Sequence, residues 1–169
     1  MTARVGDAEW LVEVGLGDGP SDPLPLIAGS HEQGGFAYGL HPSWCTEGGW
    51  RFEHDPRGGC AGFDMDTRAA ETAEFAAMHA VLSTDSVFSR LAIAQRRVDG
   101  RVEVLRGCVY TELDASGSRA RDVKTEGEWW ELVLGHFGLA YEDLDSRERA
   151  SLWRRVAAAH EAWDADGRP

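Results

Sequence analysis

The chain has 169 residues and a formal net charge of −12 at pH 7, with 43% hydrophobic residues. This length suits one ordinary domain or two small ones, and the hydrophobic content is sufficient for a packed core. The acidic balance argues against nucleic acid or an anionic membrane as a partner, because binding to either needs a basic face.

Cysteine usage and hydropathy indicate a protein of the reducing cytoplasm. Cys45, Cys60 and Cys108 form no CxxC pair and lack a histidine at zinc-ligand spacing. We therefore expect free thiols and no metal site. No apolar run reaches the length of a membrane span, and the N-terminus lacks a signal-peptide pattern.

The first half of the chain predicts short strands separated by glycine-rich turns. Alternating apolar residues or short extended runs between turns indicate strands at 8–14, 24–27, 35–40 and 49–54. Strands at this spacing favour a small antiparallel β-barrel or a sandwich over residues 5–65, and we predict a barrel. An Ala-rich helix at 69–82 follows, with Phe75, Met78, His79 and Leu82 on one face. We assign residues 1–82 to this barrel domain and its trailing helix.

The second half predicts an antiparallel sheet with helices. Asp99-Gly100 is a strong hairpin signal, because a type I′ turn needs a positive φ at both positions. Thr125 and Asp145 each begin a capping-box pattern that starts a helix. The expected strands cover 90–98, 101–106, 108–113 and 119–124. The fold class is therefore α+β, with residues 83–169 as a second domain.

A carboxylate in an apolar strand is the most informative local feature. Glu13 follows Trp10-Leu11-Val12 and leads into Gly15-Leu16-Gly17. Burying a carboxylate is costly unless a donor pairs with it, and the glycines let the backbone turn tightly and approach a ligand. Glu13 is either a structural acid capped by a buried Arg or Trp N–H, or part of a reactive site.

An ordered set of motifs resembles a known family. Leu11 to Gly19 is followed by Pro23-Leu24-Pro25-Leu26, Leu82 to Phe88, Gln95 to Gly107 and Phe137-Gly138-Leu139. Together these resemble the second and third domains of the arylamine N-acetyltransferases and the related amide synthases. The resemblance covers roughly residues 5–155 and implies a cysteine-proteinase-like acetyltransferase fold with an α/β lid.

The resemblance implies acetyl transfer from acetyl-CoA, as co-substrate, through a cysteine to an arylamine or a hydrazine. A Cys-His-Asp triad performs it in the family, and Glu13 stands at the position of the aspartate. Glutamate adds one methylene, which moves the carboxylate by about 1.5 Å. The positions that resemble the CoA-binding segments are Gly15, Leu16, Gly17, Val81, Ser83, Thr84, Asp85 and Ser86.

The family's helical first domain, with its nucleophilic cysteine, has no counterpart in this sequence, and the family histidine falls at or before Met1. We therefore expect a chain truncated at its N-terminus that is inactive alone and needs a helical domain in cis or in trans. The alternatives are a non-catalytic remnant that binds a small molecule or acyl-CoA, and an amide synthase-like partner subunit.

Several residues have plainer interpretations. Arg57-Gly58-Gly59-Cys60 mimics the nucleophile motif, but it follows Glu13 in the chain, so we expect Cys60 to be an ordinary loop thiol. The hydroxyl residues from Ser83 to Ser86 either line a CoA channel or cap helices. His79 and His160 are expected in or near the core, and His136 has no partner at a recognisable spacing.

Overall fold

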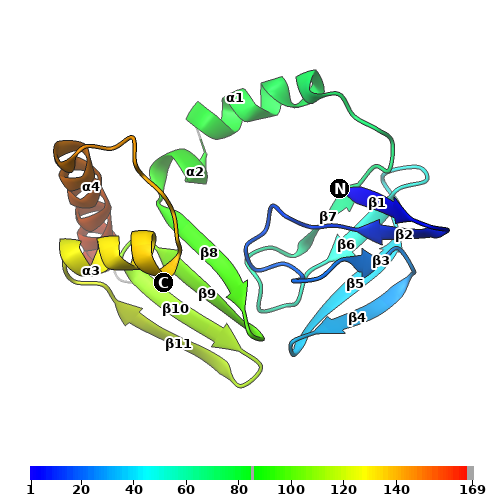
Figure 1. Cartoon of the computed structure of the whole chain (residues 1–169), viewed down its shortest axis with the longest axis horizontal. Coiled ribbons are helices and arrows are strands. Elements are labelled where there is room, and N and C mark those ends of the chain that lie inside the picture. The colour runs from blue at the N-terminus through cyan, green and yellow to red at the C-terminus, as the bar shows by residue number, and fades with distance from the viewer. Residues whose placement is uncertain (85, 167–169) are drawn as a thin grey trace. The chain divides into compact units, whose positions relative to one another are not determined.

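The computed structural model describes residues 1–84 and 86–166, which divide into two compact units. Unit 1 contains residues 1–71, 97–102 and 113–117, and unit 2 contains residues 72–96, 103–112 and the chain from 118 onward. The tips of two hairpins thus belong to unit 1, while their stems belong to unit 2. Figure 1 shows the elements of both units along the chain.

Unit 1 begins with a three-stranded antiparallel sheet of β1 (Thr2–Val5), β2 (Ala8–Leu11) and β3 (Leu24–Pro25). Gly6 has a φ of +61°, which gives the tight turn between β1 and β2. The strand predicted over 8–14 ends at Leu11. Val12 still exchanges backbone hydrogen bonds with Met1, and the chain then turns where the Glu13 side chain binds the N–H groups of Gly15 and Leu16.

The second sheet of unit 1 has the order β4-β5-β6-β7, with bounds Gly29–Gln33, Phe36–Pro42, Trp50–Glu53 and Gly62–Met65. On β5, Phe36, Tyr38 and Leu40 are buried and alternate with less buried residues, as a strand period of two requires. Unit 1 thus contains two open antiparallel sheets in its described residues, and the closed barrel expected from the sequence is not confirmed.

The sheet of unit 2 is four-stranded and has the order β11-β10-β9-β8. The strands are β8 (Ile93–Val98), β9 (Arg101–Arg106), β10 (Val109–Asp114) and β11 (Gly117–Asp122). The predicted turn is confirmed: Asp99 and Gly100 have φ values of +46° and +75°. The antiparallel sheet with helices confirms the α+β class.

Three helical segments complete the packed part of unit 2: α3 (Glu126–Trp130), a π-helix that continues it (Glu131–His136), and α4 (Ser146–Ala165). Both predicted N-caps form, since the Thr125 side chain accepts from the N–H of Glu128 and Asp145 makes a complete capping box. The apolar core of the unit gathers Leu105, Cys108, Val123, Trp129, Val133 and Val156.

A 3-10 turn (Thr72–Phe75), α1 (Ala76–Thr84) and α2 (Val87–Arg90) precede the sheet of unit 2. None of them contains a buried residue. The predicted apolar face of α1 is real but uncovered, because the exposed fractions of Phe75 and Met78 are 59% and 60%. The expectation that His79 lies in or near the core is therefore wrong. No helix in the described part of the chain is long and apolar enough to cross a membrane.

A buried carboxylate links the sheet of unit 2 to the π-helix. Glu103 on β9 is fully buried, and its Oε2 lies 2.9 Å from Arg96 Nε and 2.8 Å from His136 Nε2. Tyr110 Oη also lies 3.2 Å from His136 Nε2. The Arg96 guanidinium and the contact with His136 offset the cost of removing this carboxylate from water.

Replacing Glu103 by Ala is expected to lower the free energy of unfolding of unit 2 by about 3 kcal/mol, because Arg96 loses its buried counter-charge and His136 loses its hydrogen-bond partner. Urea denaturation followed by tryptophan fluorescence measures this loss. Glu131→Ala, at an exposed position of the π-helix, serves as the control. Equal midpoints for the two variants would contradict a supporting role for Glu103.

Candidate functional site

Glu13 is half-buried just after β2, where its carboxylate closes a tight turn. Glu13 Oε1 accepts from the N–H of Gly15 at 2.7 Å, and both carboxylate oxygens accept from the N–H of Leu16 at 3.0 and 2.9 Å. A Cβ atom at Gly19 would lie 2.7 Å from Glu13 Oε2, so only glycine leaves room there. The hydrogen-bond donors to Glu13 are thus backbone groups of the turn. The sequence had suggested, as one alternative, that a buried Arg or Trp N–H would cap this carboxylate.

The pairing of β1 with β2 fixes what faces Glu13. Thr2 pairs with Leu11, and Met1 and Val12 exchange two backbone hydrogen bonds of 2.9 and 3.0 Å. A residue added ahead of Met1 in the same register would stand opposite Glu13. Such a pair would be of the non-hydrogen-bonded type, in which opposite side chains share one face and approach most closely.

The glycine-rich loop after Glu13 is anchored by a second carboxylate, that of Asp18. Asp18 Oδ2 accepts from the N–H of Gly59 at 2.6 Å, and Asp18 Oδ1 lies 3.5 Å from His54 Nε2. The side chains of Asp18 and His54 are 6% and 0% exposed. Gly58 lies against the imidazole so closely that a Cβ atom would come within 2.0 Å of His54 Nδ1.

The contact between Asp18 and His54 shifts the pKa of each group in the direction that favours its charged form. Burial acts to raise the pKa of Asp18, but its contact with His54 and a hydrogen bond from Gly59 outweigh it and hold the pKa below its usual value. Burial acts to lower the pKa of His54, but Asp18 and the carbonyl of Asp55 raise it overall. Both ring nitrogens of His54 face oxygen atoms, Nδ1 lying 3.1 Å from Asp55 O. The imidazole is thus buried next to Asp18 and Asp55, and its Nε2 makes no hydrogen bond within the described residues.

Arg97 reaches the same loop from the tip of the β8–β9 hairpin. Its Nε donates to Gly19 O at 2.7 Å, and its Nη2 donates to Asp18 O at 3.2 Å and to the Tyr38 hydroxyl. The guanidinium also stacks on Phe36, 4.0 Å from the ring centroid. Burial raises the pKa of Tyr38 to about 12, so the phenol keeps its proton. The loop after Glu13 is thus held by several buried partners.

The Arg57-Gly58-Gly59-Cys60 segment forms a loop, as expected for an ordinary thiol. Arg57 Nε donates to Asp55 Oδ1 at 2.8 Å, and this hydrogen bond holds the pKa of Asp55 well below its usual range. Cys60 is exposed, whereas burial raises the pKa of the Cys108 thiol. No cysteine hydrogen-bonds to a histidine within residues 1–84 and 86–166.

The second set of predicted binding residues lies in unit 2, on α1 and the segment after it. Val81 is 56% exposed. Thr84 Oγ1 donates to Ala80 O at 2.8 Å, and Ser86 Oγ accepts from the N–H of Phe88 as the N-cap of α2. Ser83 Oγ lies 3.4 Å from His79 Nε2. These hydroxyls therefore have local capping contacts, and Asp85 lies outside the described residues.

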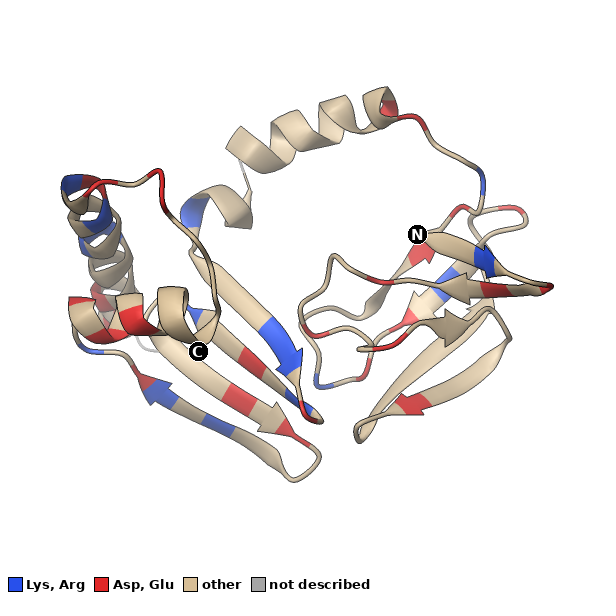
Figure 2. Ribbon diagram, in the orientation of Figure 1, with Lys and Arg blue, Asp and Glu red and all other residues tan. Residues whose placement is uncertain are grey.

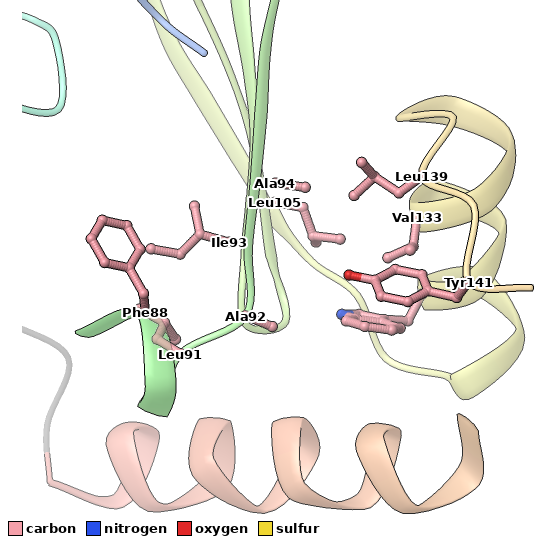
Figure 3. A pocket seen from close by; sticks show the side chains of 10 residues that line it. Phe88, Leu91, Ala92, Ile93, Ala94, Leu105, Val133, Leu139 and Tyr141 are labelled. Atoms are coloured by element: carbon pink, nitrogen blue, oxygen red, sulfur yellow. The ribbon is translucent and has the colours of Figure 1, made fainter. Parts of the chain in front are cut away.

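Unit 2 also contains an apolar groove of about 210 Å³ between the start of β8 and the π-helix (Figure 3). Phe88 and Leu91 line one end, Ala94 and Leu105 line it from the sheet, and Tyr141 lines the opposite side. The described residues contain no cluster of three or more His, Cys, Asp and Glu that could hold a metal ion.

The structure brings four predicted residues together in one turn, Glu13, Gly15, Leu16 and Gly17, within unit 1. Sequence reasoning missed the Asp18–His54 pair and the Glu103–His136 contact, because their partners lie 36 and 33 positions apart in the chain. In the sequence, the only sign of these contacts is that polar residues stand inside apolar or glycine-rich segments.

Solved structures that match this fold are arylamine N-acetyltransferases. The enzyme from Mycobacterium abscessus matches with a TM-score of 0.76 and 20% identity, over 92% of this chain and 57% of its own. The enzyme from Salmonella typhimurium matches with a TM-score of 0.73 and 20% sequence identity, over 93% of this chain and 59% of its own. The Mycobacterium marinum enzyme in complex with CoA matches with a TM-score of 0.70 and 17% sequence identity, over 88% of this chain and 59% of its own.

These matches establish the fold, and the chain spans less than two thirds of the length of the matched enzymes. The resemblance seen in the sequence is therefore confirmed at the level of the fold. No protein-family model and no curated protein sequence matches the chain.

The Asp18–His54 pair predicts a bell-shaped contribution to stability. The stabilisation from the raised pKa of His54 is complete below about pH 6.5 and is lost as the pH rises through the folded-state pKa. The stabilisation from Asp18 is complete above about pH 3.8 and is lost as the pH falls through its lowered pKa.

Asp18→Asn is therefore expected to lower the free energy of unfolding of unit 1 most between these values, by about 2 kcal/mol, and less at pH 9. Urea titrations of both proteins at pH 5.5 and pH 9 measure the difference. Asp22→Asn, at an exposed position of the same segment, is the control. A cost of Asp18→Asn that does not change with pH would contradict the charged pair.

Proposed function

We propose that this chain is the carboxylate-bearing part of an acetyl-transfer machinery of the arylamine N-acetyltransferase type. In that reaction, acetyl passes from acetyl-CoA to a cysteine thiolate and then to an aromatic amine, and Glu13 orients the histidine that activates the thiol. The observation that carries the proposal is the register of β1 and β2, which leads from Met1 and Val12 to Glu13.

Glu13 can accept a hydrogen bond from a histidine and still keep the hydrogen bonds to its own turn. Its two oxygens accept only backbone N–H groups, from Gly15 and Leu16. A carboxylate has about four lone-pair sites, so it can accept from an imidazole N–H as well. The extra methylene of glutamate lets the carboxylate fold back onto its own turn, where the shorter aspartate of the family stands closer to the strand.

The nucleophile and the base come, in this proposal, from a helical segment in the same polypeptide or in a partner chain. Cys108 is buried with a raised pKa, and His54, the histidine nearest Cys60 in sequence, is already engaged by Asp18 and Asp55. Helix α1 contains no Lys, Arg, Asp or Glu (Figure 2). It exposes Met78 and Val81, Phe75 just before it is also exposed, and this face suits packing by such a segment.

The proposed CoA contacts are Gly15, Leu16 and Gly17 in unit 1 and, considered separately, Val81 and the hydroxyl segment from Ser83 to Ser86 in unit 2. The glycines permit a close approach of backbone to ligand. Asp85 would repel a phosphate, so this segment faces the less charged portion of the cofactor.

The second candidate function is binding without turnover, as a holder of acyl-CoA or a small aromatic molecule. The local hydrogen bonds of Thr84 and Ser86, which leave these hydroxyls occupied, give the acetyl-transfer role no direct support. Thermal stabilisation by acetyl-CoA, with no amine acetylated by the complete assembly, distinguishes this function.

The chain by itself is expected to acquire no acetyl group on Cys45, Cys60 or Cys108 when it is incubated with acetyl-CoA, because a paired base is the minimum for thiol acylation. Intact-protein mass spectrometry, followed by peptide mapping, makes the measurement. Incubation with a thiol-reactive alkylating agent confirms that the exposed thiols are chemically available. An acetylated cysteine would show that this chain supplies its own nucleophile.

The role of Glu13 is tested in a fusion with the segment of the Mycobacterium abscessus enzyme that has no counterpart here. We expect acetylation of an arylamine by the fusion, a loss of roughly 10³-fold in kcat on Glu13→Gln, and retained activity on Glu13→Asp. Glu9→Gln is the matched control, because Glu9 is an exposed carboxylate of β2 that pairs only with Arg4. Equal rates for Glu13→Gln and Glu9→Gln would refute the role of Glu13.

A further inference from the structure

We propose that the apolar groove of unit 2 binds a small neutral molecule with one aromatic ring and a hydroxyl group, such as a phenol. The groove is lined by residues of α2, β8, β9, α3, the π-helix and the segment that follows it. It lies within one unit, so its geometry does not depend on the placement of unit 1.

The lining selects an uncharged ligand. Ala94 and Leu105 from the sheet and Val133 from the π-helix contribute apolar side chains, although polar atoms make up nearly half of the exposed lining. No Asp, Glu, Lys, Arg or His lines the groove, so a charged group there would lose its hydration without gaining a counter-ion. A carboxylate or an ammonium group is therefore disfavoured as the buried part of the ligand.

The size of the groove suits one ring. Its volume is about 210 Å³, and a dry apolar cavity of about 150 Å³ accommodates benzene. A ring with one or two substituents therefore fills most of the available space. Trp129 and Tyr141 supply ring edges and faces for edge-to-face or offset contacts with an aromatic guest.

The Tyr141 hydroxyl supplies the polar contact. In Figure 3 its oxygen projects from the ring toward Ala92 and Leu105, across the groove. This hydroxyl has no hydrogen-bond partner among the residues that the structure describes, whereas the other polar group of the lining, Trp129 Nε1, donates to Gly107 O at 2.9 Å. A ligand hydroxyl can donate to or accept from Tyr141, which favours a phenol over a plain hydrocarbon ring.

The experiment is an NMR titration of the ¹⁵N-labelled chain with phenol, toluene and benzoate. We expect saturable shifts at the amides of Ala92, Ala94 and Val133 with phenol, with a dissociation constant on the order of 1 mM for so small a ligand. Toluene is expected to bind roughly fivefold more weakly, because it leaves the Tyr141 hydroxyl unpaired. Benzoate is expected not to bind.

Three variants locate the site. Ala94→Leu fills the groove and is expected to weaken phenol binding at least tenfold. Ala92→Leu fills the groove from a nearby position and replaces Ala94→Leu if that variant folds poorly. Tyr141→Phe is expected to reduce the affinity for phenol to that for toluene. Ala158→Leu, the same change at an exposed position of α4, is expected to leave binding unchanged.

Non-saturable shifts with phenol, or undiminished affinity in both groove-filling variants, would overturn the proposal. Equal affinity for phenol in the unmodified chain and in Tyr141→Phe would overturn the assigned role of the hydroxyl. The titration uses neither acetyl-CoA nor Glu13, so its failure leaves the proposed acetyl transfer unaffected, and the reverse also holds.

Discussion

The buried carboxylate of Asp18 is the constraint on which unit 1 depends. It joins the glycine-rich loop after β2 to the segment that follows β6, through Gly59 N–H and the imidazole of His54. Arg97 adds two hydrogen bonds to the loop carbonyls of Asp18 and Gly19. A flexible glycine-rich sequence thereby takes one conformation, and Glu13 at its start is held where its carboxylate caps the turn.

The proposed role in acetyl transfer requires a fixed carboxylate at Glu13. A carboxylate that orients a histidine must itself be fixed, because misplacement by about 1 Å costs roughly a hundredfold in rate. The N–H groups of Gly15 and Leu16 fix the Glu13 oxygens. In unit 2, the Glu103–Arg96–His136 contacts hold the sheet against the π-helix, and the groove lies in the same unit.

Local signals in the sequence predicted the elements that depend on neighbouring residues. The Asp99-Gly100 turn and the caps at Thr125 and Asp145 formed as predicted, because their hydrogen bonds lie within a few positions. Strand β4 and the π-helix were missed, since polar residues or an ordinary helical pattern conceal them. The apolar face of α1 was predicted but its exposure was not, because periodicity shows which face is apolar and not what covers it. The assignment of Glu13 as a site residue stays a prediction, while its backbone donors and the Asp18–His54 pair depend on the folded chain.

The central claim is that Glu13 faces the position that continues β1 ahead of Met1. The most direct test is an NMR pH titration of a chain extended by a short segment that ends in a histidine joined to Met1. The account predicts that the pKa of this histidine lies above about 6.5 because the Glu13 carboxylate accepts from its ring, and that it returns to that value on Glu13→Gln. A histidine pKa that does not respond to Glu13→Gln would contradict the account.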